Sequence, residues 1–299
     1  MRSRYDTDSP SPRKWLRPVL LLLIIAATGL FIGLWLGGHR AGAPSDPSQQ
    51  GEQSVAQSTE ARPVRDAELE ALITRWAESQ PANYAVVVEE LAGDKRTAAY
   101  QADRSMVTAS TYKVFLVYSY LNAVQQGAAT LDQQLAIGYS AEACIDRLLL
   151  RSENDCAWAL GDVLGWGQID AFLEHEGFTA TKINNYDDLG NAVRGDKVST
   201  ADDEAWLMKR LQQGDLLDEK HTAMIVDRLK RQVWRERVPA GVPEDVVVAD
   251  KPGWLDNVQN DAAIVYGPKS TYVIIILSDG SSTAPLADLS AQVYEYLQR

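Results

Sequence analysis

The sequence predicts an α+β domain, in which one antiparallel sheet is built from both ends of the domain and a helical subdomain is inserted between them. Two patterns support this fold class. Stretches typical of strands lie near the start of the domain, at 84–91 and 96–101, and again near its end, at 261–266 and 271–277. Residues 114–177 are typical of short helices punctuated by glycines. This order favours helices packed on one sheet, with a functional site between the two parts.

The remaining elements follow from local patterns. Apolar residues at helical spacing predict a helix over 66–79, ahead of the first strand. A Ser-Thr cap predicts a helix over 199–211, and two more helices are expected over about 218–234 and 286–297. A strand over 246–249 leads into Lys-Pro-Gly-Trp.

An apolar segment precedes this domain. Residues 15–38 carry no charge after Arg17 and are about long enough to cross a bilayer core as one helix. Basic residues outnumber acidic ones before it, so residues 1–14 are expected to stay in the cytoplasm, with the rest outside. A secretory signal cleaved near Ala43 is the alternative. Because the apolar run is longer than a typical signal core, we expect a retained anchor in the cell membrane.

Residues 39–64 are rich in proline, serine, glutamine and glycine and predict a flexible linker. Residues 65–299 then form one domain of ordinary size. Six of the 29 basic and two of the 41 acidic residues lie in positions 1–40, which leaves a net charge of about −16 for the rest. This balance argues against nucleic acid as a partner of the domain. We expect a monomer.

Ser110 and Lys113 stand where a polar stretch turns into an apolar, helix-forming one. Their spacing places both side chains on one face of a first helical turn. A lysine amine can take the proton of a serine hydroxyl if burial or nearby positive charge keeps the amine partly neutral. The helix N-terminus would favour an oxyanion there. Taken alone, the pair is explained equally simply by a capping serine and a solvated lysine.

Two later segments fit this chemistry. The hydroxyl of Ser152, in a loop between two predicted helices, can relay a proton to a leaving group, and the amide of Asn154 can hold a substrate carbonyl. Lys251, on a predicted edge strand, supplies positive charge that can bind a substrate carboxylate and lower the pKa of a neighbouring amine.

Gly253 permits close approach of the backbone, and the N–H of Trp254 could form an oxyanion hole with that of Ser110.

With these motifs in order, residues 66–299 resemble the class A β-lactamase and penicillin-binding protein superfamily, whose signatures are SxxK, SDN and KTG. The resemblance implies a serine hydrolase that forms an acyl-enzyme, with Ser110 as nucleophile and Lys113 as base.

The motifs depart from the family pattern at two places. SDN is SEN here, which changes only the middle residue, Glu153. KTG is KPG, and Pro252 has neither the hydroxyl that contacts the substrate carboxylate in the family nor a backbone N–H. Binding of a substrate carboxylate is therefore expected to be weaker.

The resemblance also implies a water-activating residue on a later loop. Matching residues 181–191 to that loop places Asp187 where class A β-lactamases have a glutamate, and Asn191 at the asparagine four residues later. Aspartate is one methylene shorter, and a displacement of about 1 Å can cost on the order of a hundredfold in rate. Slow deacylation is the expectation, and a solvated loop carboxylate is the alternative for Asp187.

Cys144 and Cys156 flank a predicted helix–loop–helix corner in the exported part. A disulfide that clamps this corner and two buried free thiols are both compatible with this spacing. No cofactor and no metal site are expected, because the cysteines and histidines offer no ligand spacing. The three histidines are His39, His175 and His221.

Three functions follow as hypotheses. The first is a β-lactamase-like hydrolase of β-lactam amides, and the second is a DD-peptidase acting on peptidoglycan stem peptides with the same groups. The third is a catalytically impaired homologue that only binds muropeptides, for which Pro252 and Asp187 are the motivation. Retention of the nucleophile, base and relay argues against the third, since a binding protein has no need of them.

Overall fold

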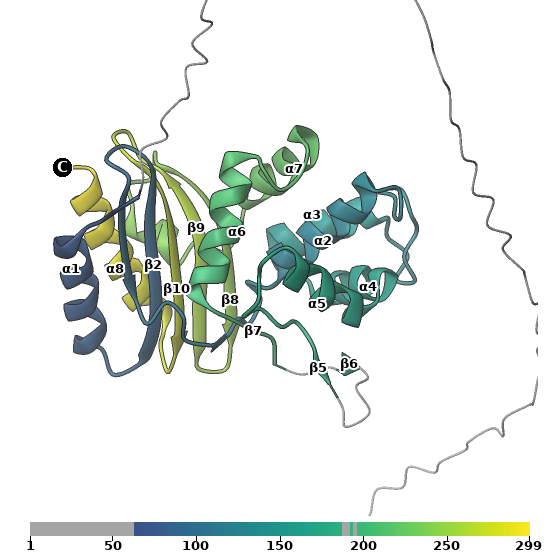
Figure 1. The fold of residues 1–299 in the computed structure, drawn as a ribbon, viewed down its shortest axis with the longest axis horizontal. Coiled ribbons are helices and arrows are strands. Elements are labelled where there is room, and N and C mark those ends of the chain that lie inside the picture. The colour runs from purple at the N-terminus through teal and green to yellow at the C-terminus, as the bar shows by residue number, and fades with distance from the viewer. Residues whose placement is uncertain (1–62, 187–191, 194–195) are drawn as a thin grey trace, which may run out of the picture. The chain divides into compact units, whose positions relative to one another are not determined.

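The computed structural model describes residues 63–186, 192–193 and 196–299 (Figure 1). The chain divides into two compact units, 1–57 and 58–299, and the first unit lies outside the described residues. The predicted segments 1–14 and 15–38, and the linker 39–64 except for its last two residues, also lie outside them. Within the described ranges, no helix has both the length and the apolar character needed to cross a membrane.

A six-stranded sheet forms the centre of the described part, in the order β1-β3-β2-β10-β9-β8. Its strands are β1 (Val64–Arg65), β2 (Asn83–Ala92), β3 (Arg96–Tyr100), β8 (Val247–Leu255), β9 (Val258–Tyr266) and β10 (Thr271–Asp279). β2 pairs with β10 in antiparallel fashion, with Val87 opposite Ile275. The two ends of the domain therefore meet in the middle of the sheet, which confirms that part of the prediction.

One edge of the sheet differs from the prediction of an antiparallel sheet. β1 pairs with β3 in parallel, and the N–H of Val64 donates to the carbonyl of Lys95 at 2.8 Å. A strand of two residues is too short to show an alternating pattern, so periodicity could not predict it. It lies at the predicted boundary between linker and domain.

Helices cover both faces of the sheet. Figure 1 shows α1 (Ala67–Ser79) and α8 (Thr283–Leu297) beside each other on one face, and α6 (Ala201–Gln213) on the other. The short 3-10 helix η1 (Val238–Gly241) packs against α8. β10 is buried without interruption from residue 272 to 278, which explains why its sequence is a continuous apolar run.

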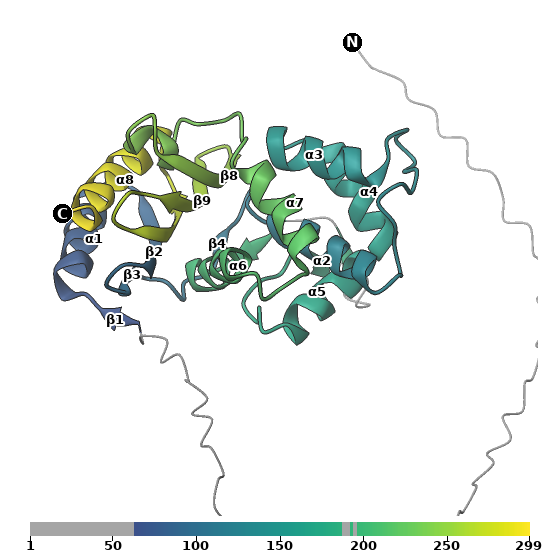
Figure 2. The same cartoon turned by 90° about the horizontal axis from the view of Figure 1, so that it is seen from above.

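The helical subdomain is built from α2 (Lys113–Gln125), α3 (Ala141–Arg151), α4 (Asn154–Leu164) and α5 (Trp166–His175), and α7 (Glu219–Leu229) packs against α2 and α3 (Figure 2). The first nine residues of α2 are all buried, because helices surround it. A helix that is apolar on all sides belongs in such a place. The predicted helical insertion between the strands is therefore confirmed.

Two short two-stranded ladders lie outside the main sheet. β4 (Met106–Val107) pairs with β7 (Val198–Ser199), and β5 (Asn185–Tyr186) pairs with β6 (Ala192–Val193). The N–H of Thr108 also donates to the carbonyl of Lys197 at 2.9 Å. These contacts bring the segment before Ser110 next to the end of the loop that carries Asp187 in the sequence.

A disulfide joins Cys144 of α3 to Cys156 of α4, with the two Cα atoms 4.8 Å apart. Both residues are buried, and they lie on either side of the Ser152 loop. Of the two alternatives that the spacing left open, the structure has the bridge. It ties together the two helices between which the loop is held.

Replacing both cysteines by alanine should lower the free energy of unfolding by about 3 kcal/mol, because the unfolded chain is no longer constrained by the closed loop of about a dozen residues. Urea denaturation of the oxidised protein and of the double variant measures this difference. Adding a reductant should destabilise the wild type and leave the variant unchanged. Equal midpoints for the oxidised protein and the double variant would contradict the expected contribution.

Candidate active site

Ser110 lies in a turn between β4 and α2. The sequence predicted it within the first turn of a helix, but α2 begins only at Lys113, whose N–H donates to the carbonyl of Ser110 at 3.3 Å. The reason is that this turn is closed by i→i−3 hydrogen bonds instead of helical ones, with the N–H of Thr111 donating to the carbonyl of Thr108 at 3.2 Å and that of Val114 to the carbonyl of Thr111 at 3.1 Å. Ala109, just before Ser110, has a φ of +48°, a left-handed conformation. Such a conformation costs on the order of 1 kcal/mol in a residue other than glycine. It turns the chain sharply just before the predicted nucleophile.

β8, an edge strand as predicted, lies directly against this turn. A Cβ atom on Gly253 would stand 2.6 Å from the carbonyl oxygen of Thr108 and 2.9 Å from the backbone nitrogen of Ser110. No side chain fits at that distance, so glycine is required here for close approach rather than for an unusual φ. The backbone of the KPG segment and that of Ser110 are therefore in contact, as the sequence predicted.

The register of β8 indicates where the N–H of Trp254 points. The carbonyl oxygen of Pro252 accepts a hydrogen bond from Nζ of Lys251 at 2.8 Å. The backbone nitrogen and carbonyl of residue 252 therefore point toward the lysine ammonium and away from β9. Backbone groups two residues apart point to the same side of a strand. The N–H of Trp254 therefore points to the side of the lysine ammonium, and proline is tolerated at 252 because no ladder bond is lost there.

Both predicted lysines converge on one hydroxyl. Nζ of Lys113 lies 3.2 Å from Oγ of Ser152 and donates to the carbonyl of Ser152 at 2.6 Å and to Oδ1 of Asn154 at 2.7 Å. Nζ of Lys251 lies 3.1 Å from the same Oγ. Both lysines are 0% exposed. The structure thus brings together the predicted base, proton relay, amide and carboxylate-binding cation.

The SEN loop is fixed by its own backbone. Ser152 has a φ of +62° and ends α3, with its N–H directed at the carbonyls of Arg147 and Leu148. The carboxylate of Glu153 accepts from the guanidinium of Arg147 at 3.0 Å, and the side chain is about one-third exposed. The residue that departs from the SDN pattern therefore pairs with α3 and not with the lysines.

Burial and a nearby positive charge lower the pKa of both amines. Burial, followed by the charge of Lys197, lowers the pKa of Lys113 to about 7, although its hydrogen bonds to two carbonyl oxygens favour the ammonium form. Burial, followed by the charge of Lys113, also lowers the pKa of Lys251. Lys113 can therefore be neutral near pH 7, which a general base requires.

Several buried charges near this site were not predicted. Asp250, next to Lys251 in β8, accepts from the guanidinium of Arg235 at 2.6 Å, and burial raises the pKa of Asp250. Asp261, on β9 opposite Pro252, is also fully buried, and burial raises its pKa to about 6. Acidic residues are common in this chain, so only their burial distinguishes these two from solvated carboxylates.

Lys197 is a further residue that the sequence analysis missed. Its ammonium lies 4.9 Å from the ring centre of Tyr112 and 5.5 Å from that of Trp166, within the range of cation–π contacts. Tyr112 immediately precedes Lys113. The position of Lys197 in the sequence, shortly after the predicted water-activating loop, could have indicated that it lies near the site.

Asp187 and Asn191 lie outside the described residues. The strands that flank them do pair, with Asn185 opposite Val193, and Lys182 forms a bridge to Val198. The base of this loop is therefore attached to β7, the strand that also pairs with the segment before Ser110.

The side chain of Trp254 is 39% exposed and packs edge-to-face on Trp234, with ring centres 5.6 Å apart. The guanidinium carbon of Arg237 lies 5.2 Å from the ring centre of Trp254.

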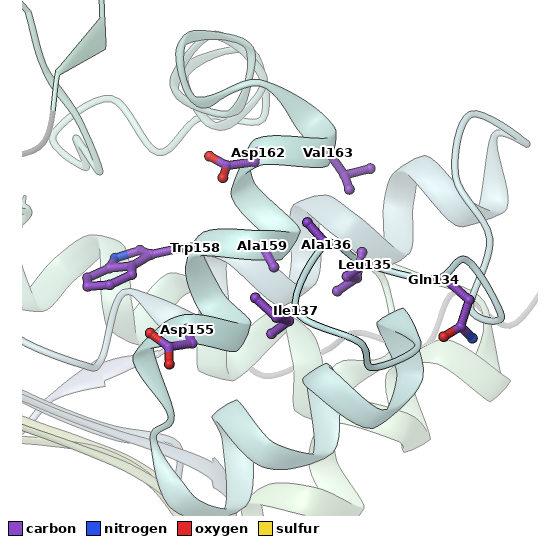
Figure 3. Close-up of a pocket in the computed structure, with 9 residues that line it drawn as sticks. All are labelled: Gln134, Leu135, Ala136, Ile137, Asp155, Trp158, Ala159, Asp162 and Val163. Atoms are coloured by element: carbon purple, nitrogen blue, oxygen red, sulfur yellow. The ribbon is translucent and has the colours of Figure 1, made fainter. Parts of the chain in front are cut away.

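A separate pocket of about 350 Å³ lies between the loop at 134–137 and the outer face of α4 (Figure 3). Its lining contains none of the predicted site residues.

The two-part fold, with a serine turn, two buried lysines and a relay serine brought together at one sheet edge, defines the class of serine hydrolases of the β-lactamase type. The model of the family described as "Beta-lactamase enzyme family" matches residues 67–297. The chain therefore belongs to this family, and the recognition made from the three motifs is confirmed.

Individual relatives agree with this membership. Beta-lactamase 1 of Bacillus cereus is 26% identical over 212 residues, covering 62% of this chain and 68% of the relative. A β-lactamase of Streptomyces fradiae is 27% identical over 215 residues, covering 61% of this chain and 69% of the relative.

Solved structures share the fold. A mutant of PBP-A, described as an acyl-enzyme complex with penicillin G, superposes with a TM-score of 0.73 at 21% identity, covering 80% of this chain and 99% of that one. An ancestral class A β-lactamase superposes with a TM-score of 0.69 at 24% identity, covering 76% and 99%.

Replacing Lys197 by methionine should raise the pKa of Lys113, because a positive charge that disfavours the ammonium is removed. The predicted base must be neutral to act, so acylation should rise with pH through about 7 in the wild type, and this acidic limb should move to higher pH in the variant. The measurement is the acylation rate with a chromogenic β-lactam as a function of pH. Lys220→Met, which removes an exposed charge on α7, is the matched control. An unmoved acidic limb in the Lys197 variant would show that this charge does not act on the base.

Proposed function

We propose that this protein is a membrane-anchored, extracytoplasmic hydrolase that opens β-lactam amide bonds through an acyl-enzyme on Ser110. The observation that carries the proposal is the convergence of two buried lysine amines on the hydroxyl of Ser152, next to the turn that holds Ser110. Burying two like charges around one hydroxyl costs stability, and such clusters of perturbed ionisable groups are typical of sites that transfer protons or bind anions. The β-lactamase relatives support the same chemistry.

Acylation begins with the neutral amine of Lys113, which takes the proton of Ser110 as its oxygen attacks the lactam carbonyl. The carbonyl oxygen becomes an oxyanion. The backbone N–H groups of Ser110 and Trp254, held close by the contact at Gly253, are the donors that stabilise it. Two preorganised donors of this kind are worth several kcal/mol in the transition state.

The lactam C–N bond then breaks, and the nitrogen needs a proton. The hydroxyl of Ser152 gives its proton to this nitrogen and is reprotonated by the ammonium of Lys113, 3.2 Å away. The ammonium of Lys251 attracts the substrate carboxylate. Because Pro252 offers no hydroxyl beside it, this carboxylate has one donor fewer than in the KTG pattern.

Deacylation requires a water molecule that attacks the ester of Ser110. Asp187 is proposed as its base and Asn191 as the residue that orients it, on the strength of their spacing in the sequence. The shorter aspartate side chain suggests that this step is the slower one.

The alternative is a peptidase that acts on peptidoglycan stem peptides with the same acylation groups. The likeness to PBP-A supports it, and the retention of nucleophile, base and relay favours it over a pure binding protein. Release of D-alanine from a stem-peptide mimic, without turnover of β-lactams, would select this function.

Mixing the full chain with a fluorescent penicillin should add the mass of one opened β-lactam to Ser110, because the nucleophile and its base are in place. Intact mass spectrometry over time measures both formation and loss of the adduct. Ser110→Ala should form no adduct while keeping the circular dichroism spectrum of the wild type. An adduct that disappears within minutes identifies a β-lactamase, and one that persists favours the peptidase. Absence of any adduct on the folded wild type would refute both.

The full chain should sediment with membranes and resist a carbonate wash, because residues 15–38 are proposed to span the bilayer and the linker 39–64 to tether the domain. Immunodetection in washed membrane and soluble fractions is the measurement, with a variant lacking residues 1–38 as control. Recovery of the full chain in the soluble fraction, shortened by about 40 residues, would instead indicate signal cleavage.

A further inference from the structure

Glu204 is a buried carboxyl with no role in the proposed reaction. It lies on α6, is 1% exposed, and contacts the turn that carries Ser110 at Thr111. Its Oε1 is 2.5 Å from Oγ1 of Thr111, the residue after the nucleophile. Its Oε2 has no hydrogen-bond partner among the described residues.

The hydroxyl of Thr111 has only one hydrogen but two neighbours that can accept it. Oγ1 of Thr111 lies 3.0 Å from the carbonyl oxygen of Thr108 and 2.5 Å from Oε1 of Glu204. A carbonyl oxygen can only accept, so both contacts are hydrogen bonds only if Glu204 donates to Thr111 and Thr111 donates to Thr108. That arrangement requires a protonated Glu204.

Among the residues that the structure describes, no positive charge contributes to stabilising an ionised Glu204. Burial, followed among the raising influences by Asp261 of β9 and Asp203 of α6, raises the pKa of Glu204 to about 8, against the opposing hydrogen bond from Thr111. Other charged groups on the neighbouring elements are paired elsewhere among the described residues. These pairs are Asp203 with Thr181, Glu89 with Lys209, Arg228 with Asp146, and Lys113 with Asn154. An uncompensated buried charge is far more costly than a buried neutral acid.

We propose that Glu204 is a positioning residue, whose proton holds the Thr108–Thr111 turn in the geometry that acylation needs. The chain of hydrogen bonds runs from Glu204 through Thr111 to Thr108, and the carbonyl of Thr108 is the atom that lies against Gly253. The left-handed Ala109 sits inside this turn, so the turn needs support from outside. β8 contacts this turn at Gly253, and the carboxyl of Glu204 contacts it at Thr111.

Ionisation of Glu204 should therefore impair catalysis without removing any group that touches the substrate. The carboxylate would draw the hydroxyl hydrogen of Thr111 to itself, and the carbonyl of Thr108 would keep only the hydrogen bond from the backbone N–H of Thr111, at 3.2 Å. The backbone N–H of Ser110 would then be held less rigidly against β8, and donors of an oxyanion hole act only within a narrow geometry. This role rests on the proposed function, because it presupposes that Ser110 is acylated.

The test is the acylation rate of the full chain with a chromogenic cephalosporin between pH 6 and 9.5. In the wild type the rate should fall by roughly tenfold or more from pH 7.5 to 9.5, as Glu204 loses its proton. Glu204→Gln keeps a donor for Thr111 and cannot ionise, so it should stay within about threefold of wild type at pH 7.5 and lose the basic limb. Glu204→Leu removes the donor and should be slower by about tenfold or more at every pH.

Asp202→Asn is the matched control, since it removes one acidic group from the same helical turn at an exposed position. It should keep the basic limb of the wild type. A basic limb that persists in Glu204→Gln, or a Glu204→Leu variant as fast as the wild type at pH 7.5, would overturn the proposal.

Thermal unfolding separates this proposal from the proposed function. An acid whose pKa is raised in the folded state stabilises the fold at low pH and loses that contribution as pH rises through the folded-state value. The Tm of Glu204→Gln minus that of the wild type should therefore grow between pH 6 and pH 9, even if no β-lactam acylates Ser110. A constant difference would refute the buried proton, whatever the outcome of the acylation assay.

Discussion

The structure depends above all on keeping two lysine amines out of water around a single serine hydroxyl. Neither Lys113 nor Lys251 is exposed, and each is within hydrogen-bond distance of Ser152. Two adjacent ammonium groups in a medium of low polarity repel each other and lose their hydration. Carbonyl oxygens on one side and the buried acids Asp250 and Asp261 on the other compensate for this cost. Burial, followed by the charge of Lys197, gives the proposed base a pKa of about 7.

The fold meets this requirement by dividing the site between two parts. The sheet contributes Lys251 on its edge strand, and the helical subdomain contributes Lys113 and Ser152. The helices of the subdomain share one apolar core with a face of the sheet, through residues such as Leu148 and Ile275, and a second core lies between the other face and α1 and α8. Packing therefore holds the two parts of the site against each other. The turn at Ala109, where the chain passes from sheet to subdomain, is consequently the element whose geometry matters most for the nucleophile.

The sequence predicted the parts of the site that are local along the chain. Ser110 and Lys113 form one short motif, Ser152 and Asn154 another, and Lys251 and Gly253 a third, so each can be found by spacing alone. Residues that act through contacts distant in sequence left no such pattern. Glu204 touches Thr111 across 93 positions, and nothing in an acidic helix start distinguishes it from its exposed neighbours. The helix start at Lys113 was missed for a related reason, because the i→i−3 hydrogen bonds before it leave no distinct pattern in the sequence.

The pairing of β2 with β10 also bears on how the chain acquires its structure. Val87 must find Ile275, so the central strands cannot close until nearly the whole chain has been synthesised. Contacts so distant in sequence slow folding and leave apolar strands unprotected in the meantime. The apolar edges of β2 therefore stay available for pairing with other chains until β10 can cover them. The chain should depend on chaperones that shield its early strands.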